Sequence, residues 1–164
     1  MVKRVANGFF VLFTVFFVLV ALSLGAIRLF GGQVYTVLSG SMEPTYKVGS
    51  LLVVMPKDYK ELKVGDPITF VLAKDLVVTH RIVEIIKDTS DEEALWFNTK
   101  GDNNNSVDAS PVYYKNIIGC PVLTIPFLGY LISFMKVPPG SYLTIGLIVV
   151  LLVIGLLPMF KRRG

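Results

Sequence analysis

The longest β-like stretch of this chain reads LVVTHRIVEII and covers residues 76–86. Its aliphatic and β-branched side chains are typical of a strand that is at least partly buried. Successive side chains of a strand point to opposite faces. The face that carries His80 should therefore also carry four apolar residues: Leu76, Val78, Ile82 and Ile86. The stretch thus predicts a long strand whose inner face holds the only histidine of the chain.

Further strands are expected on both sides of this one. Runs rich in β-branched residues predict strands over residues 34–38, 51–55, 68–72, 95–99 and 117–125. Glycine-rich or polar turns are expected between them at residues 47–49, 65–67, 73–75 and 88–93. No helical periodicity of useful length occurs between residues 33 and 125. The sequence therefore predicts a small, mainly β domain.

Two apolar runs flank this domain. Residues 5–29 are broken only by an asparagine, small residues and Arg28, and as a helix they would reach roughly 37 Å, enough to cross a bilayer core of about 30 Å. Residues 142–160 carry no charge and are also long enough to span. A cleaved secretory signal is the alternative for the first run, although a signal's apolar region is only about 7–15 residues long. A buried core helix is the alternative for the second.

Charge is distributed unevenly along the chain. The net charge is +4, but residues 31–140 hold all 12 acidic and only ten basic residues and are therefore negative. The other basic residues lie at or near the ends of the apolar runs: Lys3, Arg4, Arg28, Lys161, Arg162 and Arg163. This distribution argues against a nucleic-acid partner. By the positive-inside rule, it places both chain ends in the cytoplasm.

The domain organisation follows from these runs. Residues 1–30 form a cytoplasmic tip and an N-terminal transmembrane anchor, residues 31–140 an extracytoplasmic β domain, and residues 141–164 a C-terminal transmembrane helix with a basic cytoplasmic tail. Residues 127–135 are apolar but too short to span. They should either join the core or lie at the membrane interface.

A serine and a histidine supply candidate catalytic groups. The segment SGSMEPT, residues 39–45, follows a predicted strand, so Ser41 would lie on a sharp turn that Gly40 permits. Serine is a poor nucleophile without a positioned base. His80 is the only imidazole that could serve it. Each residue also has a simpler explanation, because Ser41 could belong to a hydrophilic turn and His80 to a satisfied core.

A polar loop adds two carboxylates. KGDNNNSVD, residues 100–108, contains Asp102 and Asp108, and either could accept the imidazole N–H of His80 and fix its tautomer. An Asx-rich surface turn remains an alternative, and so does a calcium loop, although the EF-hand spacing is absent. A typical zinc site needs several histidine or cysteine ligands, and the chain has one of each. The lone cysteine, Cys120, is expected to be a small buried residue rather than a nucleophile.

Taken together, these motifs resemble signal peptidase I. The serine segment 39–45, the triplet Thr79-His80-Arg81 and the segment TKGDNN, residues 99–104, follow one another in this order behind an N-terminal anchor. The similarity covers roughly residues 5–135. It points to the archaeal and endoplasmic-reticulum branch, in which histidine replaces the lysine base of most bacterial enzymes. Ser50 departs from the pattern, because relatives often carry aspartate there.

The resemblance implies a role for each site residue. Ser41 corresponds to the nucleophile and His80 to the general base. Asp108 matches the acid that orients the histidine, and Asp102 matches a second, supportive acid. The backbone N–H of Ser41 and the hydroxyl of Ser39 correspond to the oxyanion hole.

The function implied is that of a membrane-bound serine endopeptidase that cleaves signal peptides from secreted preproteins and needs no cofactor or metal. The expected partners are such preproteins, the lipid bilayer and accessory subunits of the secretion machinery. The expected location is the cell membrane or the endoplasmic-reticulum membrane. Two alternatives remain from the sequence: a regulatory or self-cleaving serine peptidase of the same fold, and a non-catalytic membrane-anchored β module that binds partner proteins.

Overall fold

The computed structural model describes residues 2–74, 76–87 and 94–161, and in these residues seven strands form one antiparallel sheet. The strands are β1 (Gln33–Thr36), β2 (Leu51–Met55), β3 (Pro67–Ala73), β4 (Leu76–Lys87), β5 (Leu95–Lys100), β6 (Val112–Tyr113) and β7 (Ile117–Ile125). Their order across the sheet is β1-β2-β7-β3-β4-β5-β6, so β7 joins β2 to β3. The helices are α1 (Val2–Leu29), α2 (Leu128–Lys136) and α3 (Gly140–Lys161), with short 3₁₀ turns η1 (Tyr59–Glu61) and η2 (Tyr114–Asn116).

The mainly β prediction is confirmed, and the differences from it are local. Strand β1 ends at Thr36, so Leu38 lies outside the sheet and is exposed. Strand β6 was not predicted, because two residues paired with Trp96 and Phe97 are too few to produce an alternating pattern. The turns expected at residues 88–93 and at Asp75, and the basic tail beyond Lys161, lie outside the described residues.

A β-bulge in β4 reverses which side chains face the core beyond it, so the predicted face of Ile86 is wrong. Ile82 pairs with Thr99 and Glu84 with Asn98, so Val83 is an extra residue without a partner of its own in the register. An extra residue switches the faces of everything that follows it. Ile85 therefore packs against the core, whereas Ile86, expected on the His80 face, is 38% exposed. Leu76 is exposed at the other end of the strand.

One cluster of the core lies on β3, β4 and β5 and the segments that cover them. Its buried members are Leu62, Ile68, Phe70, Ile82, Phe97 and Val112. Residues 51–54 of β2 are buried as well. Burial of each such side chain contributes about 1.5–3 kcal/mol relative to exposure. This cluster fixes the position of β4, which carries His80, and of β5, which leads into the loop that carries Asp102 and Asp108.

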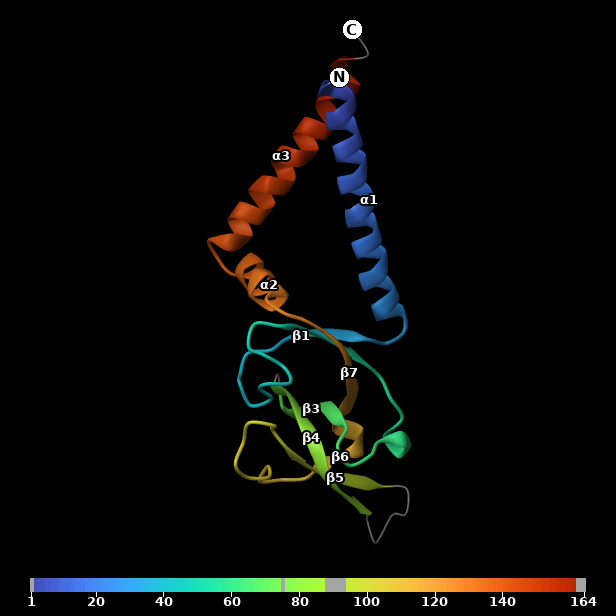
Figure 1. Ribbon diagram of the computed structural model, residues 1–164, viewed down its shortest axis with the longest axis vertical. Coiled ribbons are helices and arrows are strands. Elements are labelled where there is room, and N and C mark those ends of the chain that lie inside the picture. The colour runs from blue at the N-terminus through green and yellow to red at the C-terminus, as the bar shows by residue number, and fades with distance from the viewer. Residues whose placement is uncertain (1, 75, 88–93, 162–164) are drawn as a thin grey trace.

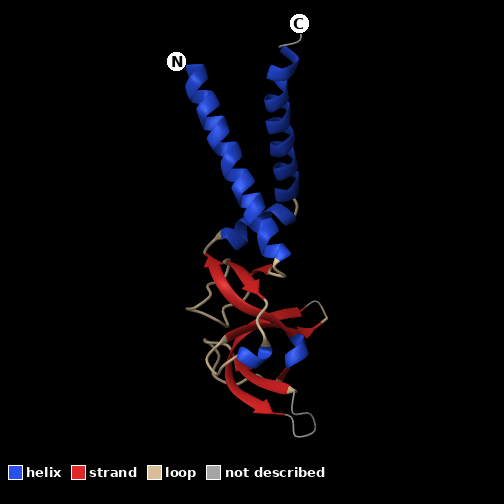
Figure 2. Ribbon diagram, turned by 90° about the vertical axis from the view of Figure 1, so that its right-hand side faces the viewer, coloured by secondary structure: helices blue, strands red, loops and turns tan. Residues whose placement is uncertain are grey.

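The two long helices extend from the same side of the β domain, and their far ends, which overlap in the view of Figure 1, are well apart in Figure 2. The Val11–Leu29 part of α1 has a mean hydropathy of 2.3, and none of it is buried, so α1 is long and apolar enough to cross a membrane. Helix α2 and the Gly140–Val150 part of α3 pass the same test only as a pair bent by 90°.

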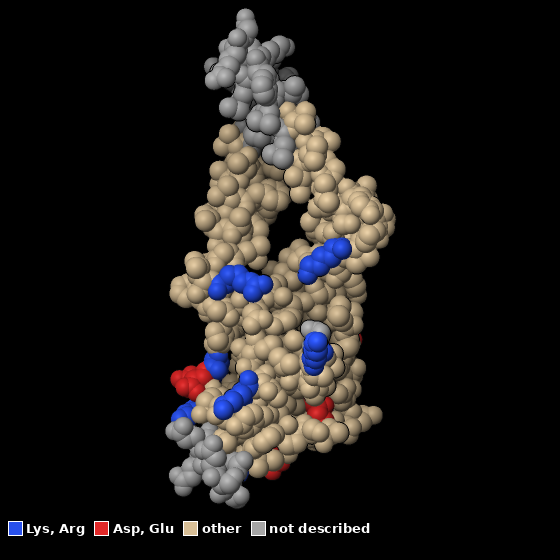
Figure 3. Space-filling model, turned by 180° about the vertical axis from the view of Figure 1, so that it is seen from behind, with Lys and Arg blue, Asp and Glu red and all other residues tan. Residues whose placement is uncertain are grey.

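Charged side chains on the face in Figure 3 gather over the β domain and its junction with the helices.

Helix α2 lies between the β domain and α3 and is not part of the core. Gly129 is its only buried residue, and the apolar side chains of Tyr130, Leu131 and Phe134 are exposed. The Tyr130 N–H donates to the Gly49 carbonyl at 3.2 Å, and Gly49 has a φ of 79°, a conformation that favours glycine. Helix α2 therefore contacts the turn at the end of residues 37–50, the serine-bearing segment that contains Ser39 and Ser41.

Candidate active site

The serine-bearing segment leaves the sheet after β1 and returns at β2. Its two ends are joined by hydrogen bonds from the Val37 N–H to the Ser50 carbonyl and from the Gly49 N–H to the Val37 carbonyl, both 2.9 Å. Within this segment Met42 is only 2% exposed. Burial of Met42 anchors the residue beside Ser41 in the domain, so the Ser41 hydroxyl is held at the surface of a cleft.

His80 comes from the middle of β4, where it pairs with Ile68 of β3. Its residue surface is 8% exposed, and its ring lies edge-on to Phe70, with 6.4 Å between the ring centroids. The Nε2 atom lies 3.2 Å from Ser41 Oγ. A rigid strand and a buried ring therefore position the one imidazole within hydrogen-bond reach of the serine.

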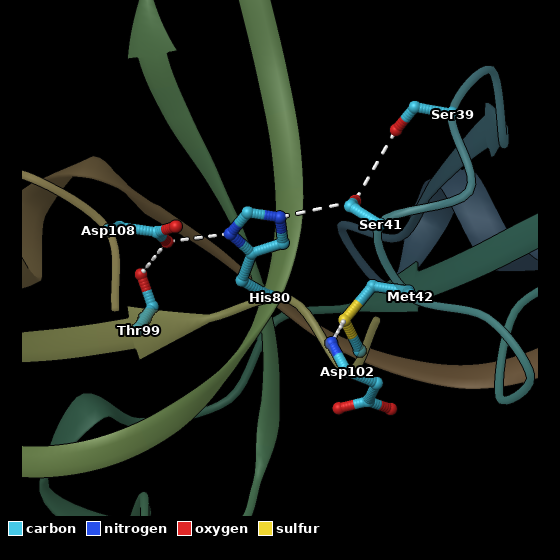
Figure 4. Close-up of polar contacts among 7 residues, drawn as sticks. All are labelled: Ser39, Ser41, Met42, His80, Thr99, Asp102 and Asp108. Atoms are coloured by element: carbon cyan, nitrogen blue, oxygen red, sulfur yellow. Dashed lines mark hydrogen bonds and ion pairs between the residues drawn. The ribbon is translucent and has the colours of Figure 1, made fainter. Parts of the chain in front are cut away.

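Asp108 completes a chain of three groups, as Figure 4 shows. Its Oδ2 atom lies 2.6 Å from His80 Nδ1. If Nδ1 carries the proton and donates to this carboxylate, Nε2 is left as an acceptor for the Ser41 hydroxyl. The same Oδ2 accepts a hydrogen bond from Thr99 Oγ1 at 2.6 Å. The arrangement can remove a proton from Ser41 and stabilise the resulting imidazolium.

Asp102 takes part in a different set of contacts. Its two carboxylate oxygens accept from Arg81 Nε at 2.8 Å and Arg81 Nη2 at 2.7 Å, and Oδ2 also accepts from the Thr45 hydroxyl at 2.5 Å. These donors, Arg81 first, hold the pKa of Asp102 below its ordinary value. Figure 4 shows its carboxylate directed away from His80. Asp102 thus joins the serine segment, through Thr45, to the strand that carries His80.

The loop of residues 100–108, which carries Asp102 and Asp108 and is called the acid loop below, also contacts the serine-bearing segment. Backbone groups of both segments take part. The Asn103 N–H donates to the Ser41 carbonyl at 2.8 Å, and the Asn103 side chain donates to the Gly40 carbonyl at 3.3 Å. A Cβ atom on Gly101 would lie 2.6 Å from the Ser41 carbonyl oxygen. Glycine at position 101 is therefore required for this close contact.

Ser39 lies at the edge of a cleft of about 410 Å³ that opens over the triad. Its Oγ is 3.4 Å from Ser41 Oγ, so its hydroxyl is near the place where a substrate carbonyl would be attacked. The cleft is lined by Ser39, Ser41, Phe70, Leu72, Val78, His80, Asn104, Asp108, Ala109 and Ser110. Cys120 is not among these residues, and burial raises the pKa of its thiol, which disfavours the reactive thiolate.

The structure thus brings Ser39, Ser41, His80 and Asp108 together, and it places Asp102 in a neighbouring ion pair. Sequence reasoning assigned no role to Thr45, Arg81 or Thr99, although each lies inside one of the three motifs. The only signal in the sequence was that each of these residues lies inside a motif. Their roles could not be predicted, because their hydrogen-bond partners lie in segments far apart in the chain.

Most of this chain matches a known protein family. The family described as signal peptidase, peptidase S26, matches residues 10–127. The chain belongs to the signal peptidase family. This finding confirms the resemblance predicted from the motifs.

Two relatives illustrate the range of these signal peptidases. Signal peptidase I W of Bacillus subtilis (strain 168) is 47% identical over 94 residues, which are 57% of this chain and 48% of the relative, so the aligned region spans about half of that protein. The signal peptidase complex catalytic subunit SEC11 of Metarhizium acridum (strain CQMa 102) is 34% identical over 140 residues, which are 79% of this chain and 76% of the relative. The similarity to SEC11 agrees with the branch of signal peptidases that the motifs indicated.

Proposed function

We propose that this chain is a membrane-bound serine endopeptidase, a signal peptidase I, that removes N-terminal signal peptides from secreted preproteins. The observation that carries the proposal is the alignment of Ser41 Oγ, His80 Nε2 and Nδ1, and Asp108 Oδ2, with separations of 3.2 Å and 2.6 Å. A serine is a useful nucleophile only beside such an oriented base. Membership of the signal peptidase family supports the choice of substrate.

The proposed reaction has two stages. Ser41 Oγ attacks the scissile carbonyl carbon while its proton passes to His80 Nε2, and Asp108 stabilises the imidazolium that forms. The Ser41 N–H and the Ser39 hydroxyl stabilise the developing oxyanion. His80 then protonates the leaving amine, which leaves an ester on Ser41. A water molecule then gives a proton to His80 as its oxygen attacks the ester carbonyl carbon. The bond between that carbon and Ser41 Oγ breaks, His80 returns the proton to Ser41 Oγ, and the carboxylate product leaves.

The cleft suggests how the substrate is held. Phe70, Leu72 and Val78 provide an apolar wall beside Ser41, which suits a short apolar side chain of an extended peptide. An extended peptide can pair with a strand edge near the serine segment. The substrate's apolar segment would then lie in the bilayer beside α1, whose described surface is unburied and apolar.

The proposed membrane arrangement has two spans. Helix α1 anchors the N-terminal side, α3 returns to the cytoplasm, and the β domain, residues 31–140, lies on the extracytoplasmic or lumenal face, in the cell membrane or the endoplasmic-reticulum membrane. The common direction of α1 and α3 in Figures 1 and 2 supports this arrangement. Exposed Tyr130, Leu131 and Phe134 support a position of α2 at the membrane interface. Protease accessibility of the β domain in sealed vesicles tests the arrangement, and cleavage from the cytoplasmic side would contradict it.

The activity is tested by incubating the detergent-solubilised protein with a preprotein. Wild type should release the signal peptide, and Ser41→Ala should not, because it lacks the nucleophile but keeps the fold. Thermal unfolding of Ser41→Ala provides the folding control. Processing that persists in Ser41→Ala would contradict the proposal.

The name of the SEC11 relative indicates a complex for that protein, and we propose that this chain also works with accessory subunits.

A further inference from the structure

The acid of the triad is held by a residue on a neighbouring strand. Thr99 Oγ1 donates to Asp108 Oδ2 at 2.6 Å, and the Asp108 N–H donates to the Thr99 carbonyl at 2.8 Å. Thr99 therefore contacts Asp108 through both its side chain and its main chain. Thr99 Oγ1 and His80 Nδ1 are both hydrogen-bonded to the same carboxylate oxygen of Asp108, Oδ2.

Thr99 is itself rigidly placed. Its side chain is completely buried, and the residue pairs in the β4–β5 ladder with Ile82, which lies two residues along β4 from His80. Asp108, by contrast, lies in a loop outside the sheet, and its side chain is 23% exposed. A carboxylate on a loop needs an external contact to keep one orientation, and a buried hydroxyl donor provides a directional one.

We propose that Thr99 is a positioning residue that fixes the Asp108 carboxylate toward His80. Two paired strands then set the geometry of His80 and Asp108, because β4 carries the base and β5 carries Thr99, which orients the acid. The Thr99 hydroxyl is bonded to Asp108, so in this proposal it takes no proton in the reaction. The role in catalysis rests on the proposed peptidase function, but the alignment of Asp108 and His80 is a property of the folded protein.

Thr99→Val tests the proposal because valine keeps the shape of threonine and lacks the hydroxyl. We expect kcat to fall about tenfold with KM changed less than twofold, since a general base loses part of its orientation. Thr99→Ser, which retains the donor, should recover most of the activity. Equal activity in wild type and Thr99→Val would overturn the proposal, and so would equal losses in Thr99→Val and Thr99→Ser.

Thr69→Val is the matched control. Thr69 is also completely buried, and its hydroxyl pairs with that of Thr79 at 2.8 Å rather than with a site residue. Loss of this buried hydroxyl should lower the midpoint of thermal unfolding about as much as Thr99→Val does. It should leave kcat near the wild-type value. A kcat loss as large as that of Thr99→Val would show a general structural effect and overturn the assignment.

A second readout does not depend on peptidase activity. His80 is the only histidine, so the proton on its ring nitrogen can be followed by NMR without assignment of other rings. His80 Nδ1 lies 2.6 Å from Asp108 Oδ2, and hydrogen bonds to an ionised acceptor are short and strong, so this proton should give a separate downfield signal. If Thr99 positions Asp108, the signal should move upfield or be lost to exchange with water in Thr99→Val and should be retained in Thr99→Ser. An unchanged signal in Thr99→Val would overturn the proposal even if the chain cleaves preproteins.

Discussion

Asp102 and Asp108 lie in the same loop but have different partners. Asp108 Oδ2 is 2.6 Å from His80 Nδ1, whereas Asp102 is held by Arg81 Nε at 2.8 Å and by the Thr45 hydroxyl. One carboxylate is therefore directed to the base of the proposed triad. The other connects three chain segments that carry the site.

This difference predicts that the two acids respond differently to replacement by asparagine. Asp108→Asn should lower kcat by about 10²–10⁴-fold, because the base loses its orienting carboxylate. Asp102→Asn should lower kcat far less but should reduce the free energy of unfolding by about 1–3 kcal/mol, since Arg81 loses a charged acceptor. Cleavage kinetics and denaturant unfolding of both variants measure the two effects. Equal, mild losses of activity would contradict the separate roles.

The lowered pKa of Asp102 predicts a pH dependence of stability. A carboxyl whose pKa is lower in the folded state than in the unfolded state stabilises the protein fully above the unfolded value, here the ordinary 3.8, and loses this effect as pH falls through the folded value. The free energy of unfolding of wild type should therefore decrease as pH falls below about 4. The decrease should be smaller in Asp102→Asn. Parallel pH curves for the two proteins would show that Asp102 does not cause it.

Ser39 is predicted to act on the transition state rather than on substrate binding. Ser39→Ala should lower kcat by about 10²-fold with little change in KM, because loss of one oxyanion donor affects the charged intermediate most. Ser106, an exposed serine outside the cleft lining, provides the control variant Ser106→Ala. A change in KM alone for Ser39→Ala would instead indicate a role in peptide binding.

Gly101 is predicted to be intolerant of even a methyl group. A Cβ there would lie 2.6 Å from the Ser41 carbonyl oxygen, so Gly101→Ala should separate the acid loop from the serine segment and cost about 1–3 kcal/mol of stability. The activity should fall with the stability, because both segments carry site residues. Gly146→Ala is the control, since a Cβ at that position meets no atom within 4 Å. Equal behaviour of the two variants would contradict the contact.

Much of the architecture could be predicted from local patterns. The alternating residues of β4, the apolar length of α1 and the glycine-containing turns each report a local preference of the backbone or of the solvent around it. The residues that contact Ser41 could not be predicted in this way. The face of Ile86 was also mispredicted, because the bulge at Val83 arises from pairing with β5 and leaves no mark on the pattern of β4 itself.

The sequence by itself determined the class of the domain, the apolar N-terminal helix and the set of chemical groups, because hydrophobic periodicity and motif order are properties of the chain. From the residues alone either aspartate could face His80, and only the resemblance to the family favoured Asp108. The tertiary structure places Asp108 beside the ring and shows that Thr99 holds it. Ser41, His80, Thr99 and Asp108 are separated along the chain and meet through strand pairing and loop closure. Their distances therefore depend on how the sheet is assembled, which no single segment encodes.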